Sequence, residues 1–474
     1  MKKSTINNTL PAKKIRYKKN SKRKERQRKA RIKREQKASI LYQLHQTILH
    51  FFPDLFDLLG EVEDCRGHSK YSITEIILAG LALFLFKKGS RNAVNNLRDE
   101  DEFKRNYRRL FNLRMPHLDT VDNVMRALPE AMLEELKHKL IQILLAKKIW
   151  HNQRLFGKYF LVAVDGTGVV SFNDKHCDQC LHKTSKTGKT NYFHHVLEAK
   201  LITASGFCVS LMTVWIENPD GDYDKQDCEL KAFARLADRL KKAYPRLPIC
   251  ITADSLYPSE GFFEICKNND WRNILTFKDG KIPSIAKAAE SQDKIDPKRL
   301  TNRVIEGKNH TEQNYRWVND INYKDHNINW LECFETTWHD DGKDAKEAKT
   351  SRFVHLTDLP IDASNAIILS RGGRLRWKIE NEGFNEQKNL GFAMSHKYSR
   401  VSYLAMKNYY QCLQIAHLFT QLIILNNRFQ AMLTGKTTCK HLWELMIGSL
   451  VFVKVCTKTL QQWASQKIQI RFIT

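Results

Sequence analysis

Apolar residues recur along this chain in two rhythms, and the change from one to the other divides it. Up to about residue 150 they return every three or four positions, which is the period of an amphipathic helix. Beyond residue 158 they gather in short, β-branched runs, which are typical of strands. The helical rhythm predicts helices over three segments, 38–52, 72–86 and 130–148. The second of these opens with Ser72 and Glu75 in the positions of a capping box.

Two of the β-like runs are almost wholly apolar, as buried strands are. They cover residues 158–164 and 247–253, and an aspartate ends each run, Asp165 in the first and Asp254 in the second. Because open α/β sheets bind ligands beyond the carboxyl ends of their strands, the two carboxylates are expected to lie near each other. The same region predicts strands over 193–203, 207–216 and 273–277, and helices over 228–243 and 259–268.

A second block of strands follows this region. Strands are predicted over 312–318, 326–338 and 351–356, joined in part by a charged and exposed segment over 340–349. Helices return over 401–432 and from Cys439 onward. The order of elements is therefore helical, then mixed, then β-rich, then helical again.

One further helix is predicted over 376–388, where Trp377 and Phe384 lie seven residues apart on one stripe. Arg376 and Glu380 are four residues apart and share a face. Such a pair at a surface stabilises a helix only slightly. Together with the two upstream aspartates, however, Glu380 makes a set of three carboxylates of the kind that binds Mg²⁺ or Mn²⁺. Paired metal ions of this type serve in-line displacement at phosphorus.

Asp165-Gly166-Thr167, Asp254 and the Arg-Trp-Lys-Ile-Glu segment at 376–380 resemble the active site of bacterial insertion-sequence DDE transposases. The closest branch has a Tyr-Arg-Glu-Lys signature and a β-strand insertion before the final glutamate. The resemblance extends from about Met115 to beyond Lys388. It implies an α/β fold with an RNase H-like catalytic core. It also implies two divalent metal ions held by Asp165, Asp254 and Glu380.

The activity implied by the resemblance is cut-and-paste transposition. The enzyme would cleave the ends of a mobile element and transfer their 3′-OH groups into target DNA. Its partners would be double-stranded DNA, in the form of terminal inverted repeats and target, and a second copy of the chain bridging two ends. Arg376 and Lys388, with Arg374 and Trp377, are the residues expected to contact DNA.

The signature is not matched at every position. Gly373 stands where the signature has its tyrosine, and seven residues rather than six separate Glu380 from Lys388. Glu382 is therefore an alternative third acid. Glu380 is preferred because Arg376 stands in the signature relation to it. In a helix the two glutamates point about 200° apart, so only one of them can face the metal ions.

The domain organisation expected from these patterns has five parts. They are a basic disordered arm over 1–37, a helical DNA-binding region over 38–150, an RNase H-like core over 155–292 and 361–430, a β-strand insertion over 293–360, and a C-terminal helical segment over 431–474.

The charge of the chain favours a polyanionic partner. The formal net charge is +26, and residues 1–37 hold 17 lysines and arginines against two glutamates, so the remainder still carries +11. Nucleic acid is favoured over a membrane surface. No secretory signal or membrane span is predicted. A cytoplasmic, nucleoid-associated protein with its 11 cysteines reduced is therefore expected.

A second group of candidate ligands lies between two predicted strands. Cys177 and Cys180, with His182 and His194, supply the donors of a Cys₂His₂ zinc site, although their spacing is not that of a standard finger. The alternative is a loop with reduced thiols. The acidic turn over 220–224 lacks the spacing of a calcium loop. Asp227 or Glu229, just after it, could contribute near the carboxylate site.

Three functions follow from these observations and stay open at this point. The first is the transposase. The second is a catalytically inactive or repurposed relative that binds DNA without cutting it. The third is a metal-dependent RNase H-like nuclease that cuts and does not join.

Overall fold

A computed structural model describes residues 40–219, 224–307, 309–339, 348–433, 437–464 and 468–470. Within these residues the fold is mixed α/β, with a ten-stranded mixed sheet and many helices. The expected basic arm over 1–37, most of the acidic turn over 220–224 and the charged segment over 340–347 lie outside the described residues. The chain divides into two compact units, and the sheet belongs to the unit of residues 54–95 and 116–422.

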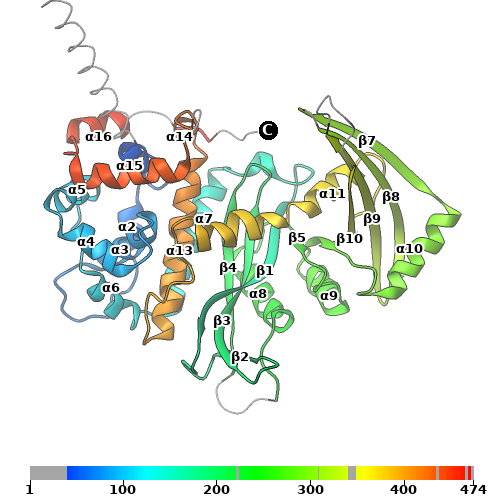
Figure 1. The fold of residues 1–474 in the computed structure, drawn as a ribbon, viewed down its shortest axis with the longest axis horizontal. Coiled ribbons are helices and arrows are strands. Elements are labelled where there is room, and N and C mark those ends of the chain that lie inside the picture. Colours follow the sequence, from blue (N-terminus) through cyan, green and yellow to red (C-terminus); the bar gives the residue numbers. More distant parts are fainter. Residues whose placement is uncertain are drawn as a thin grey trace, which may run out of the picture. The chain divides into compact units, whose positions relative to one another are not determined.

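Five strands form the part of the sheet that carries the predicted aspartates (Figure 1). Their order is β4-β3-β1-β5-β6, where β3 is antiparallel to both β1 and β4, and β5 and β6 run parallel to β1. A short strand, β2 (Leu181–Thr184), also pairs with β3. The five strands are β1 (Phe160–Phe172), β3 (Thr190–Ile202), β4 (Cys208–Ile216), β5 (Ile249–Ala253) and β6 (Arg272–Thr276).

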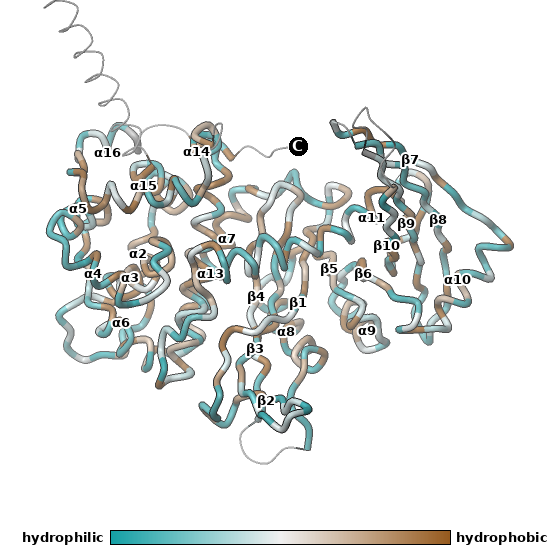
Figure 2. Tube along the Cα trace, in the orientation of Figure 1, coloured by the Kyte–Doolittle hydropathy of each residue, from teal (hydrophilic) through white to brown (hydrophobic). Residues whose placement is uncertain are grey.

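The β-rich block continues the same sheet. The three strands expected here are confirmed, and a fourth, β7, precedes them. Strand β10 pairs antiparallel with β6, and β9, β8 and β7 follow in order. The edge strand β7 and the helix α10 (Pro283–Ile295) mix hydrophilic and hydrophobic residues along their length (Figure 2). The four strands are β7 (Lys298–Glu306), β8 (Asn309–Tyr323), β9 (His326–His339) and β10 (Lys349–Thr357).

One helix of this unit begins at the start signal that the sequence predicts. The capping box of α3 (Ile73–Leu85) is confirmed, since the Ser72 hydroxyl accepts from the Glu75 N–H at 3.2 Å and the Glu75 carboxylate accepts from the Ser72 N–H at 3.0 Å. None of the helices in the described residues combines the length and apolar content that a bilayer crossing requires. Further helices of this unit precede the strands, lie between them or follow them in the sequence. They are α2 (Leu55–Gly60), α6 (Leu118–Met125), α7 (Glu130–Ala146), α8 (Glu229–Ala243), α9 (Glu260–Asn268) and α13 (Tyr403–Ile424).

The segment over 376–388 is helical, but the expectation of one regular helix is wrong. Helix α11 (Ala366–Arg374) ends in a turn, the π-helix η2 (Ile379–Asn385) follows, and α12 (Glu386–Asn389) completes the segment. A π-helix bonds each N–H to the carbonyl five residues back, so each turn takes one more residue than an α-helix. The expected shared stripe is therefore lost: Phe384 is 5% exposed, whereas Trp377 is 53% exposed.

The π-helix is fastened to the sheet by its apolar side chains. Ile379 and Phe384 join a buried cluster with Leu161 of β1, Ile274 of β6 and Leu369 of α11. Full burial of each such side chain contributes about 1.5–3 kcal/mol. The backbone that carries Glu380 is thus held against the strands that carry the aspartates.

The second unit is helical in its described part. It combines residues 40–53, 96–115 and most of 423–469, so segment 96–115 groups with the C-terminal helices rather than with the remainder of 38–150. The buried Asn106 joins them, since its Nδ2 donates to the carbonyls of Leu450 at 2.9 Å and Val453 at 2.7 Å. Its helices are residues 40–51, α5 (Asp101–Phe111), α14 (Asn427–Gln430), α15 (Cys439–Phe452) and α16 (Thr457–Ala464), while α4 (Arg91–Asp99) spans the boundary.

Candidate active site

The two aspartates lie at one edge of the sheet. The expectation that the first strand ends at Asp165 is wrong, because antiparallel pairing with β3 carries β1 on to Phe172. The parallel pairing of β1 with β5, however, stops at Ala163 and Thr252. Asp165 therefore lies just beyond the last parallel pair, and Asp254 follows the end of β5 directly.

Electrostatic coupling shows which acids surround Asp165. Burial raises the pKa of Asp165 from 3.8 to about 7, the Arg376 guanidinium opposes this rise, and the carboxylates of Glu380, Glu229 and Asp254 add to it. The structure thus brings all three predicted acids into one cluster. Glu229, one of two further candidates, is a fourth member at the start of α8.

Glu229 occupies space that only a glycine leaves free. A methyl group on Gly166 would lie 2.4 Å from the Glu229 Oε1, so any side chain at position 166 would displace this carboxylate. The Tyr257 hydroxyl donates to Glu229 Oε2 at 3.2 Å. Burial raises the pKa of Glu229, and the nearby Asp254 adds to that rise. The Asp-Gly-Thr sequence therefore matters for packing as well as for its aspartate.

Arg376 lies between two of the acids and is only 5% exposed. It donates to Glu380 Oε1 at 2.8 Å, and the same nitrogen lies 3.7 Å from Asp165 Oδ2. Its Nε is buried and has no hydrogen-bond partner among the described residues. The guanidinium also lies 4.6 Å from the ring centre of the exposed Trp377. Arg376 thus partly balances the charge of the acidic cluster.

Lys388 reaches the same site from α12. Its Nζ donates to the Thr167 hydroxyl at 2.7 Å, two residues beyond Asp165. Burial lowers the pKa of Lys388, and Asp165 opposes that effect. In a regular α-helix, a residue eight positions after Glu380 would point about 80° away from it around the helix axis. The extra residue that η2 takes per turn removes this offset, so the seven-residue spacing still delivers both side chains to one site.

The remaining candidates of this segment have other partners. Glu382 pairs with Lys378, away from the cluster around Asp165. Arg374 donates to Glu335 of β9 at 2.8 Å and lies 4.0 Å from the Phe353 ring centre, so it ties α11 to the β-rich block. At Gly373, where the resembled signature has tyrosine, an added Cβ would lie 2.3 Å from the His355 ring.

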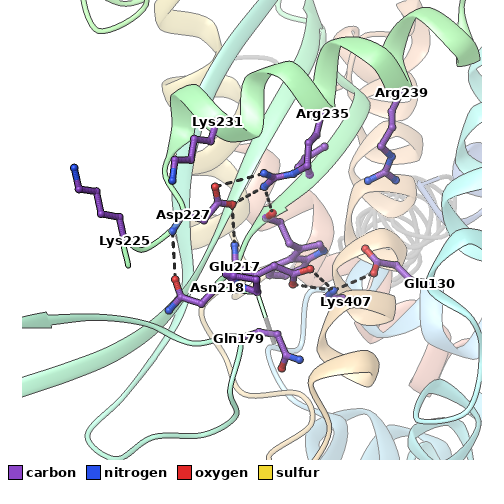
Figure 3. Close-up of a pocket in the computed structure, with 13 residues that line it drawn as sticks. Glu130, Gln179, Glu217, Asn218, Lys225, Asp227, Lys231, Arg235, Arg239 and Lys407 are labelled. Carbon is purple, nitrogen blue, oxygen red and sulfur yellow. Dashed lines mark hydrogen bonds and ion pairs between the residues drawn. The ribbon is translucent and has the colours of Figure 1, made fainter. Parts of the chain in front are cut away.

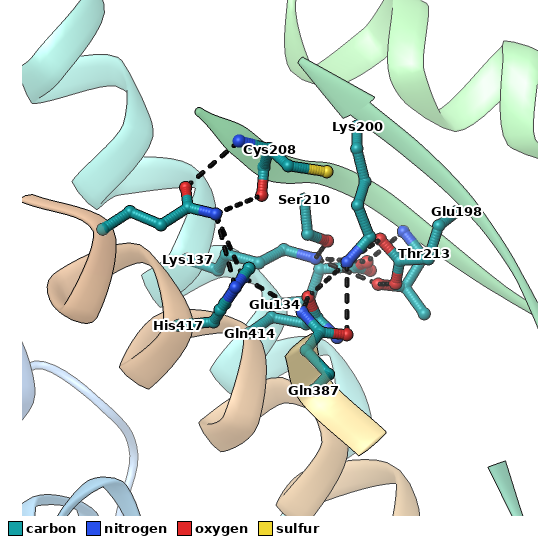
Figure 4. A network of polar contacts seen from close by, with 11 residues as sticks. Glu134, Lys137, Glu198, Lys200, Cys208, Ser210, Thr213, Gln387, Gln414 and His417 are labelled. Atoms are coloured by element: carbon teal, nitrogen blue, oxygen red, sulfur yellow. Dashed lines mark hydrogen bonds and ion pairs between the residues drawn. The ribbon is translucent and has the colours of Figure 1, made fainter. Parts of the chain in front are cut away.

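A buried polar network holds Gln387, the residue next to Lys388 in the sequence (Figure 4). Gln387 is fully buried, and its Nε2 donates to Gln414 of α13 at 2.9 Å. Lys200 of β3 donates to the same Gln414 oxygen at 2.9 Å. Buried hydrogen-bonded networks of this kind fix one side-chain arrangement. The residue next to Lys388 is therefore pinned between the sheet and α13.

A separate basic pocket of about 610 Å³ opens beside α8 (Figure 3). Arg235 pairs there with Asp227, and Lys407 pairs with Glu217 at 3.0 Å. Asp227, the other sequence candidate near the carboxylates, thus belongs to this pocket instead. The further lining residues include Glu130, Gln179, Trp215, Asn218, Lys225, Lys231 and Arg239.

The Cys and His candidates converge in part. Cys177, Cys180 and His194 come together, and the fourth position is taken by His176, not by the expected His182. His182 lies in β2, where its backbone N–H donates to Gln226 at 2.7 Å. Sequence spacing did not distinguish the two histidines. The ligand atoms of these four residues all lie within 4.8 Å of one another. Within the described residues, the acids around Asp165 do not form a group this close.

Comparisons with known proteins assign no family. No protein-family model matches the sequence, and no curated protein matches it. A solved structure of the piggyBac transposase, in a synaptic complex with hairpin DNA, overlaps this chain with a TM-score of 0.39 and 11% sequence identity. The overlap covers 89% of this chain and 84% of that one. At this score the match is too distant to assign a function.

Proposed function

We propose that the chain is a DNA transposase of the DDE type, which cleaves the ends of a bacterial insertion sequence and transfers their 3′-OH groups into target DNA. The observation that carries this proposal is the convergence of Asp165 and Glu380 on the buried Arg376, whose Nη1 lies 3.7 Å from the first carboxylate and 2.8 Å from the second. Burial, and to a smaller extent the neighbouring acids, raises the pKa of Asp165 to about 7, and a carboxyl perturbed in this way is typical of a functional site. A purely structural role offers no reason for several acids to converge.

The strand arrangement supports an RNase H-like core. Three antiparallel strands, followed along the sheet by two that run parallel to the first, hold the aspartates on β1 and directly after β5. The four strands β7 to β10 then precede the helical segment with Glu380 in sequence. This matches the expected insertion before the third acid.

The donor set fits divalent cations. Asp165, Asp254 and Glu380 would hold Mg²⁺ or Mn²⁺, since these ions prefer carboxylate oxygens. The chemistry that such ions supply when bound as a pair is activation of the attacking oxygen and stabilisation of the leaving one. A bound cation would favour the ionised form of Asp165, whose pKa is raised by burial and, to a smaller extent, by the neighbouring acids.

Other side chains of the chain would position DNA. Arg376 and Lys388 bring positive charge to either side of Asp165, where a scissile phosphate would bind. Trp377 is 53% exposed and carries the Arg376 guanidinium over one face of its ring, so the other face would stack on an unpaired base. Arg374 is held by Glu335 and would act on DNA only by positioning this segment.

The partners proposed for this enzyme follow from its charge and its chemistry. The net charge of +26 favours double-stranded DNA, both as terminal inverted repeats and as target. Joining two element ends calls for two active sites, so a homodimer is proposed for the DNA complex. A nucleoid-associated location in the cytoplasm is proposed on the same grounds.

The test uses purified protein and DNA that spans its gene and both flanks, with and without Mg²⁺. New 3′-OH ends are mapped by sequencing, and joining is scored by amplification of junctions in an added plasmid. We expect Mg²⁺-dependent cuts at the edges of an inverted repeat, followed by joining. The Asp165→Asn variant should bind DNA without cutting it, while the surface variant Asp296→Asn should cut normally.

Two outcomes would assign one of the other functions. Cuts without junctions would identify a nuclease that does not join. Retarded DNA without any cuts, from protein that circular dichroism shows to be folded, would overturn the enzyme proposal in favour of a DNA-binding protein.

A further inference from the structure

We propose that His176, Cys177, Cys180 and His194 bind one Zn²⁺ ion in a closed structural site. The site is distinct from the acidic cluster, and it does not depend on the proposed activity. One ligand atom from each residue lies within 4.8 Å of all the others. Cys180 and His194 are buried, and Cys177 and His176 are half-buried.

The distances between the donor atoms are those that a tetrahedral zinc ion imposes. Zn–S bonds of about 2.3 Å and Zn–N bonds of about 2.0–2.1 Å place two sulfurs about 3.8 Å apart, and a sulfur and a nitrogen about 3.6 Å apart. In this chain the two Sγ atoms lie 3.7 Å apart. His194 Nε2 lies 3.5 Å from Cys177 Sγ and 3.4 Å from Cys180 Sγ. Three edges of the tetrahedron are therefore already formed.

His176 has the proton arrangement of a ligand. Its Nε2 lies 3.1 Å from the backbone carbonyl oxygen of Arg400, which can only accept, so Nε2 carries the proton. Its Nδ1 then has a free electron pair, is buried and has no hydrogen-bond partner among the described residues. A zinc-binding histidine is usually fixed by a hydrogen bond from its other ring nitrogen, the one that does not bind the metal, to a carbonyl or carboxylate oxygen.

The surroundings hold these side chains in place. The His194 ring stacks on Tyr403 with centroids 3.9 Å apart, and the His176 ring stacks on Phe172 at 4.4 Å. The buried Asn218 donates to the Cys180 carbonyl at 2.8 Å. Two thiolates and two neutral imidazoles would balance the charge of Zn²⁺, so the closed site would suit its buried position.

The zinc ion would tie the loop between β1 and β2 to strand β3. His194 pairs in register with Val170, on the part of β1 that follows Asp165 and Thr167. Zinc would thus stabilise the pairing of β1 with β3 at the end of β1 that lies beyond Asp165. Its removal should loosen residues 173–180 first, since no other covalent link closes that loop.

The test measures zinc in the full chain, purified from zinc-supplemented medium without chelators. We expect about one zinc per chain by mass spectrometry, released when a mercurial reagent titrates the thiols. After the zinc is exchanged for Co²⁺, the absorption spectrum should show a thiolate-to-cobalt charge-transfer band and the intense d–d bands of tetrahedral geometry. This measurement needs no variant, so it is decisive even where a variant misfolds.

Matched variants then locate the ligands. Cys180→Ser and His176→Asn should lower the zinc content at least several-fold. Cys228→Ser, at an exposed cysteine outside the cluster, and His182→Asn, at the neighbouring histidine, should keep one zinc per chain. Folded wild-type protein with no zinc and no cobalt–thiolate band would overturn the proposal, as would loss of zinc in His182→Asn but not in His176→Asn.

Discussion

Replacing Asp165 by asparagine should stabilise the metal-free protein. Burial and the neighbouring acids raise the pKa of Asp165 from 3.8 to about 7, and its side chain is only 18% exposed. Since a tenfold change in an equilibrium constant corresponds to about 1.4 kcal/mol, ionisation of this carboxyl costs the folded state about 4 kcal/mol at pH 8. Asparagine has nearly the same shape and stays neutral, so Asp165→Asn should raise the free energy of unfolding by as much as about 4 kcal/mol.

The sign of this effect sets its pH dependence. Well below pH 3.8 the carboxyl is protonated in both the folded and the unfolded chain, and it costs nothing. As the pH rises from about 4 to about 7, the unfolded chain loses the proton before the folded chain does, so the wild-type protein loses stability. The advantage of Asp165→Asn should therefore fall to about 2 kcal/mol at pH 5.

The assay is urea unfolding in the presence of a chelator, followed by circular dichroism at pH 5 and pH 8. Asp296→Asn is the matched control, because this carboxylate is 73% exposed and should change stability by less than about 1 kcal/mol. Adding Mn²⁺ at about 100 times its dissociation constant should then stabilise wild type, but not Asp165→Asn, by about 2.7 kcal/mol. An Asp165→Asn protein that is less stable than wild type at pH 8 would refute this reasoning. So would a variant whose free energy of unfolding differs from that of wild type by the same amount at pH 5 and at pH 8.

Three further predictions follow from the same geometry. Lys200→Met should lower the free energy of unfolding by about 3 kcal/mol, because the fully buried Glu198, 3.9 Å from the Lys200 Nζ, loses one of the two buried cations that interact with it and keeps Lys137; a loss below about 1 kcal/mol in urea unfolding would contradict this. Gly373→Ala should cost about 1–3 kcal/mol by forcing a Cβ against His355, whereas Gly261→Ala, which meets open space in α9, should be neutral or slightly stabilising, and equal effects in thermal unfolding would count against the packing argument. Arg376→Met should raise the pKa of Asp165 further, so the pH midpoint of Mn²⁺ binding should move upward, and an unchanged midpoint in calorimetric titrations would exclude this role.

Some parts of the site are determined by residues that are neighbours in the sequence, and sequence patterns predict these parts. Buried strands are typically continuous apolar runs, and a carboxylate directly after such a run needs polar partners or a cation to offset its burial. Asp165 and Asp254 were found on that basis, and they lie at one edge of the sheet. The capping box at Ser72 and Glu75 was equally local, and it forms as expected.

Features that depend on distant contacts could not be predicted. The π-helix packs where Gly383 approaches Cys208, with an added Cβ only 3.0 Å from its sulfur, and nothing in the local sequence indicates that contact. His176 and His182 flank the same cysteines, and only the return of the chain at Arg400 selects His176. Asp227 and Glu229 are both candidates from the sequence, and the choice between them depends on the fold. Helix α8 begins beside Gly166, more than 60 positions earlier in the chain, so Glu229 joins the acids, whereas Asp227 pairs with Arg235.

The most direct test of the acidic cluster compares Glu380→Gln with Glu382→Gln in Mg²⁺-dependent cleavage of DNA that carries the element ends. The two glutamates lie two residues apart on the same π-helix, but Glu380 faces Arg376 and Asp165 whereas Glu382 pairs with Lys378. Cleavage should be lost in Glu380→Gln, by a factor of a thousand or more, and kept within tenfold of wild type in Glu382→Gln. Full activity of a folded Glu380→Gln protein would contradict the assignment of Asp165, Asp254 and Glu380 as the metal-binding acids.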